Sequence, residues 1–248
     1  MEHHEHLAGL DSEIDAFLGA IRTAPLDRPV QTCPGWDIAE LIRHTGGVHR
    51  WAEWHVRNLA PQRRSQADIG ISAPSDDELV EWFADGGRLL VATLQAADPE
   101  AAMWAWGADQ HVRFWSRRQV HETAIHRVDA EAAVGVASTL APRLAADAIS
   151  ELLQNLPTAA YFAPNVRLLV GNGESIHVHC TDTDGEWTIT LEADGFRVEA
   201  THSKATVALR GTASDLALVL YRRTELDDRF EVFGERTVLD FWLDHATI

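Results

Sequence analysis

The sequence has few cysteines, no cluster of basic residues and no long apolar run, and each absence excludes a class of protein. Its two cysteines, Cys33 and Cys180, lie far apart and form no Cys-x-x-Cys motif, so a disulfide scaffold and a zinc ribbon are both unsupported. With 38 acidic residues against 21 basic ones, the formal net charge is −17. Because phosphate contacts need clustered lysine and arginine, we expect no nucleic-acid partner.

The chain also lacks signals for a membrane. No apolar run approaches the roughly 20 residues that a spanning helix needs, and the N-terminus lacks the basic, apolar and small-residue regions of a secretory signal. The acidic surface favours solubility. We therefore expect a cytoplasmic protein with no membrane partner. The histidine-rich first six residues are expected to be frayed, and the sequence does not indicate an oligomeric state.

Helical patterns dominate the first part of the chain. Apolar residues between positions 7 and 21 recur at spacings of three and four, which predicts a helix with one buried face. Further helices are expected over residues 37–60, 75–97, 112–132 and 141–156. Asp37 with Glu40 and Ser75 with Glu78 mark two of the helix starts. The first four helices predict a bundle, a fold in which metal sites are built from facing helices.

Two adjacent glycines, Gly46 and Gly47, interrupt the second predicted helix. Together they cost about 2 kcal/mol relative to alanine. This cost indicates close packing, a kink, or backbone that must approach another group.

After residue 156 the apolar period changes from about 3.6 to 2, which indicates strands. Strands are predicted over residues 166–170, 176–180, 187–191, 196–200 and 205–209, in a meander, followed by helices over 213–222 and 235–243. Pro157 and Pro164 lie where the pattern changes. The predicted domains are therefore a helical bundle over residues 1–158 and a small α+β domain over residues 159–248.

The strongest chemical signal is a glutamate and a histidine one helical turn apart, Glu122 and His126. Carboxylate and neutral imidazole are ligands for Zn²⁺ and other borderline divalent metals. A third ligand has to come from another helix, and His44 is the best placed because it falls within the apolar arc of the second helix. His49 lies about 140° away around that helix and is expected outside the site.

These residues also fit two simpler interpretations. The stripe formed by Gln119, Glu122, His126 and Asp129 fits a solvent-facing helix surface with a weak Glu–His pair. A buried His44 fits a carboxylate or carbonyl partner as well as a metal. The spacing alone leaves these alternatives open.

The longer motifs are more specific than the spacing. The N-terminal ones are Thr32-Cys-Pro-Gly-Trp-Asp-Ile-Ala-Glu-Leu-Ile-Arg-His44, Gly46-Gly-Val-His-Arg-Trp51 and Val120-His-Glu-Thr-Ala-Ile-His-Arg-Val-Asp-Ala-Glu131. The C-terminal ones are Val207-Ala-Leu-Arg-Gly-Thr-Ala-Ser-Asp-Leu216, Phe233-Gly-Glu-Arg236 and Trp242-Leu243. In combination, and over essentially the whole chain, they resemble the mycothiol-dependent maleylpyruvate isomerase family of actinobacteria.

The resemblance implies a DinB-like four-helix bundle that carries a divalent metal, usually zinc, on His44, Glu122 and His126. It implies a sterol-carrier-like α+β second domain and the thiol mycothiol as co-substrate. Mycothiol would serve either cis–trans isomerisation or transfer of the thiol to a small electrophile. The family also implies an arginine of the second domain that holds substrate carboxylates, for which Arg210, Arg222 and Arg223 are the candidates.

Two competing functions use the same features. In one, the chain is a non-catalytic carrier whose C-terminal domain binds an apolar ligand. In the other, the same metal ligands activate water, and the protein is a metal-dependent hydrolase.

Overall fold

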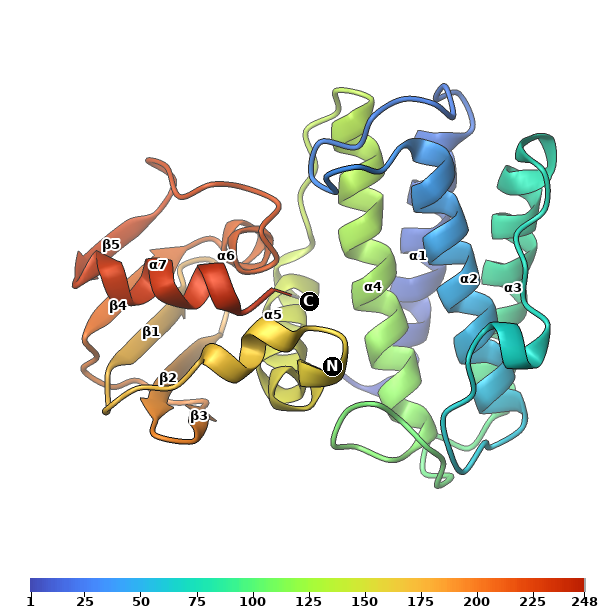
Figure 1. Ribbon diagram of the computed structural model, residues 1–248. Helices are drawn as coiled ribbons and strands as arrows, with labels where there is room; N and C mark the ends of the chain where they lie inside the picture. The colour runs from blue at the N-terminus through green and yellow to red at the C-terminus, as the bar shows by residue number, and fades with distance from the viewer. Residues whose placement is uncertain (248) are drawn as a thin grey trace. The chain divides into compact units, whose positions relative to one another are not determined.

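The structure, a computed structural model, describes residues 1–247 and divides into two compact units, Met1–Ser138 and Thr139–Ile248 (Figure 1). Each unit is described by itself. None of the helices in the described residues combines the length and apolar character needed to cross a bilayer.

The first unit is a bundle of four long helices, as the sequence predicted. They are α1 (His3–Ile21), α2 (Ile38–Arg57), α3 (Leu79–Ala96) and α4 (Val112–Ala133), with the short 3₁₀ helices η1 (Ala67–Ile69) and η2 (Asp76–Glu78) between α2 and α3. Helix α1 packs against α3 and α4, and α2 packs against the same two helices. Phe17 and Phe83 stack in the core with ring centroids 4.6 Å apart.

Local capping explains where the helices of this unit begin. At α2, the Asp37 side chain accepts a hydrogen bond from the Glu40 N–H at 2.8 Å, which confirms the predicted capping box. The prediction at Ser75 was wrong in detail, because that residue precedes the 3₁₀ turn η2 and α3 begins only at Leu79. The expectation of a frayed N-terminus was also wrong. A capping box between Glu2 and Glu5 starts α1 at His3.

Close packing accounts for the glycine pair in α2. A Cβ atom at Gly46 would lie 2.4 Å from the Trp82 ring, and one at Gly47 would lie 3.0 Å from the Gln66 amide. The Arg50 guanidinium also packs on the Trp82 ring, 4.8 Å from its centroid. Gly46 therefore lets α3 approach α2, and Gly47 lets the side chain of Gln66, at the start of η1, approach α2.

The second unit is a five-stranded sheet with helices, which confirms the α+β prediction. Its strands are β1 (Ser175–Cys180), β2 (Glu186–Glu192), β3 (Gly195–Glu199), β4 (Val207–Gly211) and β5 (Glu231–Gly234), in the order β3-β2-β1-β4-β5. Strands β1, β2 and β3 form an antiparallel meander, whereas β4 pairs parallel to β1 and antiparallel to β5. The helices are α5 (Pro142–Asn155), α6 (Ala213–Leu220) and α7 (Arg236–His245), and the 3₁₀ helices are η3 (Leu156–Tyr161) and η4 (Pro164–Leu168).

Three predictions about this unit differ from the structure. The predicted meander includes only β1, β2 and β3, because β4 crosses over to pair parallel to β1. The strand expected over residues 166–170 is largely the 3₁₀ helix η4. Val166 within it and its two cap residues, Ala163 and Leu169, are buried at a period of three. The short strand β5 was not predicted because its side chains are mostly exposed and do not alternate.

The division between the units falls after Ser138, earlier than the boundary expected between residues 158 and 159. The reason is that α5 packs against α6 and so belongs to the second unit. Its helical pattern resembles that of the bundle, so the change of period in the sequence comes only after α5.

Candidate metal centre

The three residues expected to bind a metal converge within the helical bundle. His44 comes from α2, and Glu122 and His126 come from successive turns of α4, which packs against α2. One ligand atom from each lies within 4.8 Å of the others. The Glu122 Oε1 atom lies 3.1 Å from His44 Nε2 and 3.4 Å from His126 Nε2.

The spacing of these atoms fits a divalent cation. Tetrahedral coordination with bonds of about 2.0–2.1 Å separates neighbouring ligand atoms by about 3.3 Å. The separations of 3.1 and 3.4 Å around Glu122 Oε1 agree with that value. With three protein ligands, a tetrahedral ion keeps one position for another molecule.

A buried aspartate orients the His126 ring. Asp129 Oδ2 accepts a hydrogen bond from His126 Nδ1 at 2.8 Å, and this leaves Nε2 facing Glu122. Burial alone would lower the pKa of His126, but hydrogen bonds with Asp129, Cys33 and Glu122 outweigh it and hold the pKa well above its usual value. A carboxylate on the far nitrogen of a histidine is the usual support of a metal-binding imidazole.

Glu122 is held in its charged form. Burial alone would raise the pKa of its carboxyl group, but the Arg118 guanidinium and hydrogen bonds with His126 and His44 hold it well below its usual range. Arg118 forms an ion pair with Glu122 Oε2, and its side chain is itself buried. The other oxygen, Oε1, faces the two histidines and is the one placed to bind a cation.

A loop before α2 covers one side of the group. Backbone hydrogen bonds from Val30 N to Trp36 O and from Trp36 N to Cys33 O fold this loop tightly. The Trp36 ring lies 4.8 Å from the His44 ring and 6.1 Å from the His126 ring, measured between centroids.

The group opens towards solvent at His44, whose side chain is 37% exposed against 9% for His126. Cys33 Sγ lies 3.3 Å from Asp129 Oδ2 and completes the polar surroundings. His44 is therefore the most solvent-exposed member of the group.

His49 is not part of this group. Thr123 Oγ1 donates to the Gln119 carbonyl at 2.7 Å, so His49 Nε2 donates to that hydroxyl at 2.8 Å. Burial lowers the pKa of His49 to about 3, which keeps the ring neutral. It is a core histidine with a hydroxyl partner.

Four residues around the group did not enter the predicted ligand set, although signals for each were present. Asp129 follows His126 by three residues in the polar stripe, and Arg118 precedes Glu122 by four. Cys33 and Trp36 lie in the same motif as His44. The contacts of Asp129 and Arg118 are local to α4, so spacing could have indicated them. The contacts of Cys33 and Trp36 with α4 depend on long-range packing, so spacing along the chain could not assign their roles.

The candidate arginines lie in the second unit. Arg210, on β4, forms an ion pair with Glu231 of β5 at 2.8 Å. Arg222 follows α6 with a positive φ of 61° and lies 3.8 Å from Asp244. Arg223 donates a hydrogen bond to the Tyr221 carbonyl at 2.7 Å.

Comparisons with known proteins identify both units. The family model of the mycothiol maleylpyruvate isomerase N-terminal domain matches residues 7–131, and the model of the MDMPI C-terminal domain matches residues 143–241. A search of curated proteins found no match to the sequence.

Solved structures agree on the fold. The crystal structure of the mycothiol-dependent maleylpyruvate isomerase is 14% identical in sequence and superimposes with a TM-score of 0.58, covering 95% of each chain. A histidine-to-alanine mutant of that isomerase is 15% identical, with the same TM-score and coverage. The two matched models together span nearly all of the sequence, and the chain therefore belongs to the mycothiol maleylpyruvate isomerase family of enzymes.

Proposed function

We propose that this enzyme holds a zinc ion, or another divalent metal, on His44, Glu122 and His126 and uses the thiol mycothiol as co-substrate. Its reaction would be cis–trans isomerisation of a small electrophile, or transfer of the thiol to it. The observation that carries the proposal is the convergence of these three side chains from two helices, within a chain that belongs to this family.

The residues around the group suit that chemistry. A divalent cation bound there lowers the pKa of a coordinated thiol, so that the thiol ionises near neutral pH. Asp129 keeps His126 Nε2 directed at the group, and Arg118 keeps Glu122 ionised. The buried positions of His126 and Asp129 protect these hydrogen bonds from water.

Sulfur chemistry explains how one site serves both reactions. A thiolate that adds to one carbon of a conjugated double bond displaces the π electron pair onto the adjoining carbonyl, as an enolate. Either this carbanion takes up a proton and the carbon–sulfur bond persists, or, after rotation about the former double bond, the electron pair re-forms that bond and expels the thiolate. The first course is S-transfer and the second is isomerisation. The exposed side of His44 supports the proposal that both molecules reach the metal there.

Among the arginines we propose Arg222 for binding a substrate carboxylate. Arg210 is already neutralised by Glu231 at 2.8 Å, whereas the nearest acid to Arg222, Asp244, is 3.8 Å away. Arg222 also adopts a left-handed backbone conformation just after α6, where glycine is favoured. A non-glycine residue there costs about 1 kcal/mol, which is consistent with a functional role for its side chain.

Replacing Arg222 by glycine separates function from stability. Because glycine suits the left-handed backbone, we expect Arg222→Gly to unfold at the same or a higher denaturant concentration. The KM for a carboxylate-bearing electrophile should rise by about tenfold or more, since a charged hydrogen bond is lost. Arg210→Gly is the comparison, and an equal rise in KM in both variants would contradict the assignment.

Metal content and thiol consumption test the proposed reaction. We expect His126→Ala and His44→Ala each to lose one equivalent of zinc, measured by mass spectrometry of the metal, together with thiol-dependent turnover of small electrophiles. His4→Ala, an exposed histidine of α1, should retain both. Full metal content in the His126→Ala protein would refute the site. Turnover of an ester without added thiol would instead identify a hydrolase, and binding of apolar ligands without turnover would identify a carrier.

A further inference from the structure

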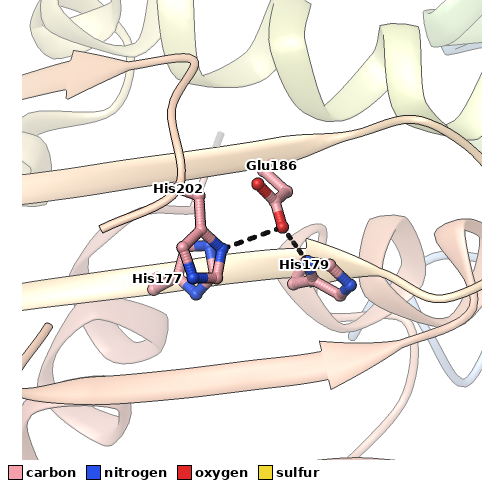
Figure 2. A group of neighbouring side chains, drawn as sticks. All are labelled: His177, His179, Glu186 and His202. Atoms are coloured by element: carbon pink, nitrogen blue, oxygen red, sulfur yellow. Dashed lines mark hydrogen bonds and ion pairs between the residues drawn. The ribbon is translucent and has the colours of Figure 1, made fainter. Parts of the chain in front are cut away.

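Three histidines and one glutamate of the second unit converge on the sheet, and the proposed reaction uses none of them. His177 and His179 alternate along β1 with Ile176, Val178 and Cys180, which are buried apolar residues. Because side chains alternate across a strand, the two histidines share the opposite, polar face. The register of β1 and β2 pairs His179 with Glu186, and this brings the glutamate to the same place (Figure 2).

The fourth member, His202, comes from the segment after β3. Thr188, the partner of His177 on β2, donates a hydrogen bond to the Thr201 carbonyl at 3.0 Å. The same hydroxyl lies 2.8 Å from Ser203 Oγ. These contacts hold residues 201–203 against β2, and the His202 ring lies 4.8 Å from the His177 ring between centroids, at 82°.

The ligand atoms of the four residues face one another. One from each lies within 4.8 Å of all the others. Glu186 Oε1 accepts hydrogen bonds from His202 Nδ1, at 3.1 Å, and from His179 Nδ1, as Figure 2 shows. The Glu186 carboxylate is therefore hydrogen-bonded to two of the three imidazoles, those of His179 and His202.

His177 has a buried nitrogen that a bound ion would satisfy. Its side chain is 5% exposed, and its buried Nε2 atom has no hydrogen-bond partner among the described residues. Buried polar atoms in native proteins almost always have a partner.

The types of ligand atom indicate which metal ions these four residues would bind. Imidazole nitrogens with one carboxylate oxygen suit Zn²⁺ and neighbouring transition-metal ions, whereas Mg²⁺ and Ca²⁺ prefer oxygen ligands alone. Tetrahedral binding needs ligand atoms about 3.3 Å apart. The ring of His202, whose side chain is 73% exposed, can move to close the remaining distance because little packs against it.

We propose that His177, His179, Glu186 and His202 form a second binding site for Zn²⁺ or a similar transition-metal ion. Four protein ligands fill a tetrahedral ion, so this site is structural and has no open position for substrate. The ion fastens the segment around His202 to β1 and β2. It is independent of the group around His126, which lies in the other unit.

The test uses the full-length chain carrying His126→Ala, so that the group in the bundle no longer binds. This protein should still bind one Zn²⁺ or Co²⁺ per chain in equilibrium dialysis, and Zn²⁺ should raise its Tm. Adding His202→Ala, which removes little packing because the side chain is exposed, should weaken the remaining binding by about 100-fold or more. His179→Ala should do the same. His245→Ala, a histidine of α7 outside the cluster, is the matched control.

The outcomes separate the two sites. If His126→Ala removes all bound metal, or if His202→Ala and His179→Ala bind metal as tightly as the His245→Ala control, the second site is refuted. If His126→Ala changes nothing and His202→Ala removes all metal, the second site stands and the group in the bundle fails. Far-UV circular dichroism checks that each variant is folded.

Discussion

The support that Asp129 gives to His126 leads to a quantitative prediction. Asp129 is fully buried, and its Oδ2 accepts the hydrogen bond from His126 Nδ1 at 2.8 Å. In Asp129→Asn the side chain keeps its size and an oxygen, but it loses the negative charge that stabilises a metal-binding imidazole. Removing such an outer carboxylate weakens metal binding by about 10–100-fold, which corresponds to about 1.4–2.7 kcal/mol.

The chain contains a matched control for this change. Asp109 Oδ1 lies 2.6 Å from His111 Nδ1 in the same unit, and this pair is separate from the candidate metal centre. Asp109→Asn therefore makes the same chemical change without touching the site.

Competition against a coloured zinc chelator measures the affinity of both variants. The titrations use proteins that also carry His202→Ala, so that only the group in the bundle binds metal. We expect Asp129→Asn to lose at least tenfold in affinity and Asp109→Asn to match the parent. Equal affinities in the two variants would refute the reasoning, because His126 would then not depend on its buried partner.

Two further predictions concern stability. Gly46→Ala should lower the free energy of unfolding by about 1–3 kcal/mol because its Cβ meets the Trp82 ring. Gly19→Ala is the control, because its Cβ would contact nothing, and it should raise the free energy of unfolding by up to about 1 kcal/mol. Urea unfolding measures both variants. Stabilisation by both substitutions would disprove the close-packing explanation. His49, with its pKa lowered from 6.5 to about 3, contributes stability that is present above pH 6.5 and lost as the pH falls towards 3. Between pH 6.5 and 3 the free energy of unfolding should therefore fall less in His49→Gln than in the parent protein, by up to about 5 kcal/mol. The same pH dependence of urea unfolding in both proteins would contradict this prediction.

Local signals in the sequence determined much of the architecture. The spacing of apolar residues predicted the helices of the bundle, because a buried stripe must recur with the helical period. The capping box at Asp37 and the change of period after α5 depend only on neighbouring residues. Glu122 and His126 could be paired from their spacing because one helix places them on the same face.

Tertiary structure decided everything that depends on contacts between distant segments. The parallel pairing of β4 with β1, and the place of α5 in the second unit, follow from packing that no local pattern encodes. Asp129 already lies one turn from His126 on α4, but only the packing of the bundle buries this pair and brings it next to His44 and Cys33. His177 and His202 likewise meet only because strand register and the Thr188 hydrogen bonds place them together. The sequence of a helix or strand determines which side chains lie on each of its faces. The burial of apolar faces against one another then decides which of these side chains come into contact.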